Sequence, residues 1–126
     1  MAIIGLGIDA TDLYRIREVL DKYGDRFLHR VFTEGEIAYA KRRRDPVPHL
    51  GGRFAVKDAA MKALGTGQSQ GVAWRSIEVV RAGGPPQLRL HGGAARRAEQ
   101  MGVTRSLVTI THSETLAFAQ VLLFND

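Results

Sequence analysis

Apolar and polar residues follow two different patterns along this chain of 126 residues. In the first half, apolar side chains recur every three or four positions, which is typical of amphipathic helices. In the second half they tend to alternate with polar ones, which is typical of strands. The expected helices cover residues 12–23, 25–31, 34–43, 49–64 and 94–101. The expected strands cover residues 2–8, 74–81, 87–91, 106–112 and 116–124.

The order of these elements predicts an α+β domain in which an antiparallel sheet packs against helices. Short turns at residues 83–85 and 113–115 separate two pairs of expected strands, so each pair is predicted to form a hairpin. The strand over residues 2–8 is expected to join the sheet. A chain of this length can bury one core, and we expect residues 1–126 to form a single domain.

Several residues indicate where the helices begin and end. Thr33 and Glu36 have the spacing of a capping box, which predicts a helix directly after Thr33. Asp9 or Thr11 is expected to cap the first helix. Gly65 follows the last periodic residue of the longest helix and is expected to end it.

The composition excludes several kinds of site. The chain has no cysteine, so it can form neither a disulfide nor a zinc site with cysteine ligands. Its first apolar segment is interrupted by glycines and ends at Asp9, so it is too short for a signal peptide or a membrane span. We therefore expect a cytoplasmic protein that does not act on membranes.

The net charge of +5 favours an anionic partner. Nucleic acid, a phosphorylated ligand and an acidic protein all satisfy this condition. The densest run of cations, residues 41–44, lies at the expected end of a helix, where the helix dipole favours positive charge. We interpret this run as a solvated helix end.

Residues 53–67 combine a helix with a glycine turn. At about 100° per residue, small apolar side chains share one face of this helix and charged ones share the opposite half. The charged half carries Arg53, Lys57, Asp58 and Lys62, with Phe54 and Met61 among them. Cations, a carboxylate and a Gly-Thr-Gly turn suit a metal-bound phosphate anhydride. The alternative is a solvated face with an Asp58–Lys62 ion pair.

Three blocks of sequence together resemble one family. They are Gly-Leu-Gly-Ile-Asp ending at Asp9, the segment 53–67, and Val-Thr-Ile-Thr-His-Ser around His112. In order and spacing they are similar to holo-[acyl-carrier-protein] synthases, the small bacterial 4′-phosphopantetheinyl transferases. The resemblance implies transfer of phosphopantetheine from coenzyme A (CoA) to a serine of apo-acyl carrier protein, in support of fatty acid biosynthesis. It also implies a magnesium ion and a homotrimer with active sites at subunit boundaries.

The resemblance implies two metal ligands, Asp9 and Asp58. Their alternative roles are a helix cap for Asp9 and an ion pair with Lys62 for Asp58. The family usually has Lys-Glu where this chain has Lys57 and Asp58. The shorter carboxylate therefore predicts altered metal geometry, with a water between Asp58 and magnesium if the backbone has not moved inward.

The resemblance further implies how CoA is bound. Arg53, Lys57 and Lys62 would surround its phosphates, and the backbone amides of Gly65 and Thr66 would face an anion. His112 would line the CoA pocket. The predicted catalytic residues are Asp58, Lys62 and His112, while the general base stays open between His112, a carboxylate and a metal-bound water. The other histidines, His29, His49 and His91, are expected at the surface.

A basic surface is predicted for the acidic carrier protein. The resemblance implies that Arg15, Arg26 and Arg30 contact it, and that Phe54 and Met61 lie at this contact or at a subunit boundary. Two other functions stay open. A nucleic-acid-binding module would explain the net charge but not the carboxylates. A catalytically impaired relative would explain the substitution at Asp58.

Overall fold

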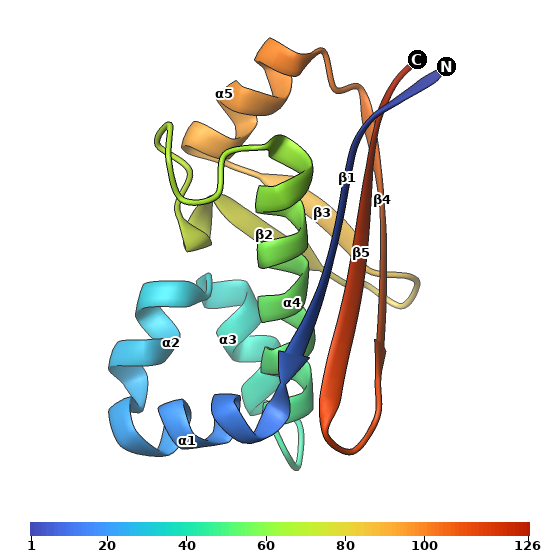
Figure 1. Ribbon diagram of the computed structural model, residues 1–126. Coiled ribbons are helices and arrows are strands. Elements are labelled where there is room, and N and C mark those ends of the chain that lie inside the picture. Colours follow the sequence, from blue (N-terminus) through green and yellow to red (C-terminus); the bar gives the residue numbers. More distant parts are fainter.

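The computed structural model describes all 126 residues and contains five helices, one short 3₁₀ turn and five strands. A long central helix lies against a three-stranded sheet, and a two-stranded hairpin covers part of its other side (Figure 1). The helices are α1 (Leu13–Tyr23), α2 (Asp25–Val31), α3 (Glu34–Lys41), α4 (Val47–Leu64) and α5 (Gly92–Met101), and η1 (Trp74–Ser76) is the 3₁₀ turn. The strands are β1 (Ala2–Asp12), β2 (Ile77–Val80), β3 (Gln87–Leu90), β4 (Arg105–His112) and β5 (Leu116–Asn125).

The architecture confirms the predicted α+β class and both hairpins. In the larger sheet the order is β1-β5-β4, with all neighbours antiparallel, so the first strand does join the C-terminal hairpin. The second hairpin pairs β2 with β3. The strand predicted over residues 74–81 is wrong at its start, because residues 74–76 form η1.

The first strand is longer than predicted, and this changes the role of Asp9. Pairing between β1 and β5 continues to Asp12, so Asp9 and Thr11 lie within the strand. The cap of α1 is Asp12, whose Oδ1 accepts a hydrogen bond from the backbone N–H of Tyr14 at 2.9 Å. Both caps expected from the sequence are therefore wrong, and the Asp9 side chain is free for another function.

Helix α4 packs directly on β1 and β5. Gly7 of β1 allows the close approach, because a Cβ at this position would collide with the carbonyl of Ala59. The helix begins at Val47, two residues earlier than expected, with Pro48 in its first turn, where a missing N–H costs nothing. Gly65 ends it in the left-handed conformation at φ 73°, as predicted. The predicted capping box at Thr33 is also confirmed.

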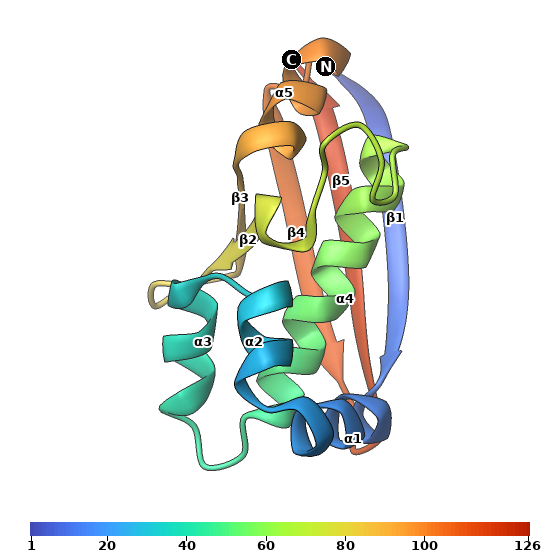
Figure 2. The same ribbon diagram turned by 90° about the vertical axis from the view of Figure 1, so that its left-hand side faces the viewer.

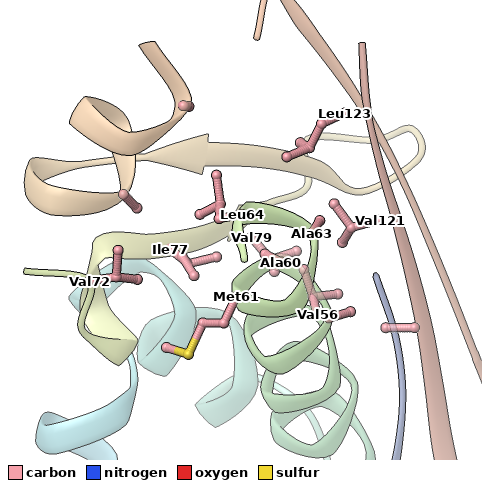
Figure 3. Packing of buried hydrophobic residues seen from close by; sticks show 14 of the residues in the cluster. Val56, Ala60, Met61, Ala63, Leu64, Val72, Ile77, Val79, Val121 and Leu123 are labelled. Carbon is pink, nitrogen blue, oxygen red and sulfur yellow. The ribbon is translucent and has the colours of Figure 1, made fainter. Parts of the chain in front are cut away.

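Two hydrophobic clusters meet along α4. One lies between α4, α5, the small hairpin and β5 (Figure 3), and the other joins α1, α2 and α3 to the first turns of α4. Figure 2 shows α1–α3 gathered at one end of α4 and α5 at the other. Met61, expected on the charged half of the helix, belongs to the first cluster and is buried.

The face of the large sheet that points away from α4 is apolar and exposed. Gly7 faces α4, so its neighbours Leu6 and Ile8 project to the opposite side, since side chains alternate along a strand. Five large apolar side chains are exposed by 38 to 61% on this face. They are Ile3, Leu6, Ile8, Leu107 and Phe118. None of the helices is long and apolar enough to cross a membrane.

Candidate active site

Asp9 and Asp58 come together where β1 passes α4. The Lys62 ammonium bridges them, with Nζ 3.5 Å from Asp9 Oδ1 and 3.2 Å from Asp58 Oδ2. The same ammonium donates to the carbonyl of Ile8 at 3.0 Å. The hydroxyl of Thr11 donates to Asp9 Oδ2 at 2.9 Å and so fixes the orientation of this carboxylate. Two residues far apart in the sequence thus form one acidic site.

The charges in this site perturb one another. The pKa of Asp9 is raised, first by burial and then by the neighbouring Asp58, while Thr11 and Lys62 oppose the shift. The pKa of Lys62 is raised, chiefly by its hydrogen bond to Asp58. A cation near the carboxylates therefore relieves their mutual repulsion.

The donor set fits a magnesium ion. Magnesium is usually held by one or two carboxylates, with phosphate oxygens and water completing its shell. Asp9 and Asp58 supply two carboxylates on two rigid elements. The Lys62 side chain is 54% exposed, so it can turn away from the carboxylates toward a bound phosphate.

A pocket of about 370 Å³ opens beside the two carboxylates. Arg15 of α1 lies on its rim, and its apolar wall includes Phe54 stacked on Trp74, with ring centroids 4.8 Å apart. A second pocket, which shares Val19 and Phe27 with the first, is lined by Arg26 and Arg30. The structure therefore places the three arginines predicted for the carrier protein on two adjoining pockets, one of which also contains the carboxylates.

Lys57 does not belong to this site. Its side chain is 0% exposed and its Nζ lies 2.8 Å from Oε1 of the equally buried Glu36. The ammonium also donates to the carbonyls of Trp74, at 3.0 Å, and Ile77. Burial lowers the pKa of Lys57, and Glu36 opposes this shift. The phosphate-binding role predicted for Lys57 therefore does not fit its position, because all of its donors are used inside the protein.

The Gly-Thr-Gly turn also differs from expectation. The backbone N–H of Gly65 donates to the carbonyl of Lys62, and that of Thr66 donates to Met61. These bonds close the C-terminal end of α4, where the helix dipole disfavours an anion. The turn ends the helix as its glycine indicates, so these two N–H groups already have partners inside the protein, and CoA binding by Gly65 and Thr66 stays a prediction.

Arg53, about 140° around α4 from Asp58, belongs to a second group of cations. Its guanidinium stacks on the Tyr39 ring of α3, and Arg43 approaches the same ring. His49, expected at the surface, is half-buried and its ring meets that of Tyr39 at 5.8 Å. Its pKa is lowered by burial first, then by Arg53, Arg43 and His112. Arg53, Arg43 and His49 thus gather around Tyr39 in one basic cluster, and the charge of His112 acts on it.

The acidic and basic groups lie at opposite edges of the large sheet. Asp9 belongs to the edge strand β1, His112 belongs to the edge strand β4, and β5 separates the two. The half of α4 predicted to be one charged face is therefore divided among three environments. Asp58 and Lys62 face β1, Lys57 faces Glu36, and Arg53 faces Tyr39.

Sequence reasoning missed four residues of these sites. The sequence indicates only a helix cap for Thr11 and a capping box for Glu36, and it indicates no functional role for Tyr39 or His49. The strand alternation that places Thr11 on the same face as Asp9 was a usable signal. No sequence signal connects Glu36 to Lys57 or Tyr39 to Arg53, because these contacts join different helices.

Comparison with known proteins agrees with this fold. The model of the 4'-phosphopantetheinyl transferase superfamily matches residues 5–119. A holo-[acyl-carrier-protein] synthase of Solibacter usitatus is 44% identical over 124 residues, which cover 98% of this chain and 99% of that protein. The crystal structure of such a synthase from Neisseria meningitidis superposes with a TM-score of 0.90 at 30% identity, covering 98% of this chain and 100% of the other. The synthase of Bacillus anthracis, solved in complex with CoA (3',5'-ADP), has a TM-score of 0.81 at 35% identity and 98% coverage of both chains.

Proposed function

This chain belongs to the 4′-phosphopantetheinyl transferase superfamily, and from that membership we propose that it is a holo-[acyl-carrier-protein] synthase. It transfers the phosphopantetheine group of CoA to a serine of apo-acyl carrier protein and releases adenosine 3′,5′-bisphosphate. The nucleic-acid-binding module and the impaired relative are not favoured, since relatives that match along almost their whole length carry the synthase name. The cytoplasmic location inferred from the sequence stays a prediction.

The reaction requires alignment and charge neutralisation more than covalent participation by the protein. The serine oxygen attacks the phosphorus on the pantetheine side of the diphosphate and the bond to the adenosine-side phosphate breaks. The serine proton passes to a general base, for which His112 and a carboxylate of the site are the candidates. Asp9 and Asp58 would hold a magnesium ion, which supplies positive charge to the diphosphate when bound. Lys62 lies one turn beyond Asp58 on α4, and its ammonium neutralises the negative charge of the leaving adenosine bisphosphate.

The observation that carries this proposal is the pair of carboxylates bridged by Lys62 beside an open pocket. Incubation of the protein with apo-carrier protein, CoA and magnesium, read by intact mass, should add one phosphopantetheine group to the carrier. Asp9→Asn should abolish the addition while its circular dichroism spectrum stays that of the wild type. A folded wild type that modifies no acyl carrier protein would refute the proposal.

Magnesium dependence is a separate part of the proposal. Activity should vanish with a chelator and return with added magnesium, because two facing carboxylates otherwise repel the diphosphate. Full activity in the chelator would mean that Lys62 alone neutralises the site.

We further propose that the working enzyme is a homotrimer with sites between subunits. Three observations support it: the acidic and basic groups lie at opposite sheet edges, both groups suit parts of one substrate, and an apolar sheet face is exposed. An active site built from the Asp9 edge of one copy and the His112 edge of another would unite them.

Mixing two inactive variants tests this arrangement. Asp9→Asn and His112→Ala, unfolded and refolded together, should recover part of the wild-type activity, because some interfaces then combine an intact Asp9 with an intact His112. Light scattering on the wild type should report three chains. A monomer, or mixed oligomers without any recovery, would contradict the shared site.

The surface formed by the two adjoining pockets, with Arg15, Arg26 and Arg30, is proposed as the carrier-protein surface. Its positive charge suits an acidic partner, and its apolar wall of Phe27, Phe54 and Trp74 offers contact area. Charge reversal at Arg26 should raise the KM for carrier protein more at low salt than at high salt. An equal rise in the KM for CoA would contradict the assignment.

A further inference from the structure

The ring of Tyr39 lies between two guanidinium groups that come from different elements. The central carbon of Arg53, on α4, is 4.0 Å from the ring centroid, and that of Arg43, just beyond α3, is 4.2 Å away. The His49 ring meets Tyr39 edge-on, with an interplanar angle of 64°. One aromatic side chain thus contacts three of the basic groups in the cluster.

Arg53 is unusual among these groups because it is buried without a counter-charge. It is 4% exposed, its only hydrogen bond runs from Nη1 to the carbonyl of His49 at 3.4 Å, and its Nε has no partner. Neither Arg53 nor Arg43 has a carboxylate within 4 Å. A buried charge is normally paired, so this arrangement favours binding of an anion.

The π-face of Tyr39 compensates part of this charge and restricts the positions of both guanidiniums. The pKa of the Tyr39 hydroxyl is lowered, first through hydrogen bonding with Arg43 and to a smaller extent by the charge of Arg53, so both cations lie close to this one residue. An arginine side chain loses much rotational freedom when it binds an anion. Stacking it on an aromatic ring beforehand reduces that loss.

We propose that Tyr39 is a positioning residue, whose ring holds Arg43 and Arg53 ready to bind a phosphate group of CoA. This inference rests on the proposed function, since that function supplies the phosphorylated ligand. The phosphate bound here is one that stays on the adenosine product, because the reacting phosphorus must lie near Asp9 and Asp58. The ring, rather than the hydroxyl, is the part of Tyr39 that matters.

Calorimetry with adenosine 3′,5′-bisphosphate tests the proposal without turnover. Tyr39→Leu should raise the Kd about tenfold, since it removes two cation–π contacts, while Tyr39→Phe should stay within about threefold of the wild type. Tyr14→Leu, at an exposed tyrosine of α1, should bind like the wild type. If Tyr39→Leu does not fold, Tyr39→Met fills similar space without a ring and takes its place.

Adenosine 5′-monophosphate as a second probe identifies the phosphate. An effect of Tyr39→Leu on the bisphosphate alone assigns the 3′-phosphate, whereas an equal effect on both probes assigns the 5′-phosphate, and either supports the proposal. With CoA as substrate, the KM should rise while kcat stays within about twofold.

Two results would overturn the positioning role. A folded Tyr39→Leu that binds the bisphosphate like the wild type would show that the ring is dispensable. A loss in Tyr39→Phe equal to that in Tyr39→Leu would show that the ring alone does not position the arginines. A wild type that binds no adenosine 3′,5′-bisphosphate would instead refute the proposed function.

Discussion

Replacing Lys57 by Met should destabilise the protein strongly while leaving the CoA site intact. The change removes the ion pair with Glu36 and the hydrogen bonds to the carbonyls of Trp74 and Ile77, all without solvent to replace them. Breaking a buried pair by removing one partner costs about 3–5 kcal/mol. Glu36 keeps bonds from the N–H groups of Thr33 and Val79, which favours the lower part of that range.

This loss is large compared with the total stability of roughly 5–15 kcal/mol expected for a domain. For a chain of this size it corresponds to a fall in Tm of roughly 10–20 °C. Urea unfolding followed by circular dichroism measures the free energy directly. The KM for CoA, measured at a temperature where the variant is folded, should stay near the wild-type value.

Lys62→Met is the matched control, because it makes the same chemical change on the same helix. Lys62 is 54% exposed, so its ion pairs contribute less than about 1 kcal/mol. This variant should keep its stability and lose activity. Combining Lys57→Met with Glu36→Leu should recover part of the lost stability, because no unpaired charge is then left buried. If Lys57→Met unfolds like the wild type and raises the KM for CoA, the phosphate role inferred from sequence is right and the argument from burial fails.

Three other predictions concern the charged sites. Asp58→Glu should lower the magnesium concentration that gives half-maximal activity, because the open pocket has room for the extra methylene, and Asp58→Asn should raise this concentration. If the wild type and both variants respond equally to magnesium, Asp58 is only the ion-pair partner of Lys62. Arg15→Glu should raise the KM for carrier protein in a salt-dependent manner and leave CoA binding, measured by calorimetry, unchanged. Burial first, and then the nearby charges of Arg53 and Arg43, lower the pKa of His49 below its usual 6.5. As the pH falls, His49 is therefore protonated in the unfolded state before it is protonated in the folded state. The free energy of unfolding should fall as the pH drops below about 6.5. His49→Gln should lose less stability than the wild type in urea titrations between about pH 7 and about pH 5, and an unchanged slope would contradict this origin.

The local elements were largely determined by the sequence itself. The capping box at Thr33, the glycine that ends α4 and the alternation in β4 and β5 act over a few neighbouring residues, so the pattern predicts them without knowledge of the fold. The resemblance likewise identified Asp9 and Asp58, which the structure brings together around Lys62.

Tertiary structure decided which of the polar residues on α4 meet solvent. Helical periodicity shows that Arg53, Lys57 and Asp58 share one half of the helix, but not that α3 and the small hairpin cover most of that half. Lys57 is buried because Glu36, on another helix, is placed to receive its charge, and Arg53 is buried because Tyr39 stacks on it. Such partners are distant in sequence and leave no periodic signal, since their approach depends on how whole elements pack. The separation of Asp9 from His112 has the same origin, because it follows from the position of β5 between β1 and β4.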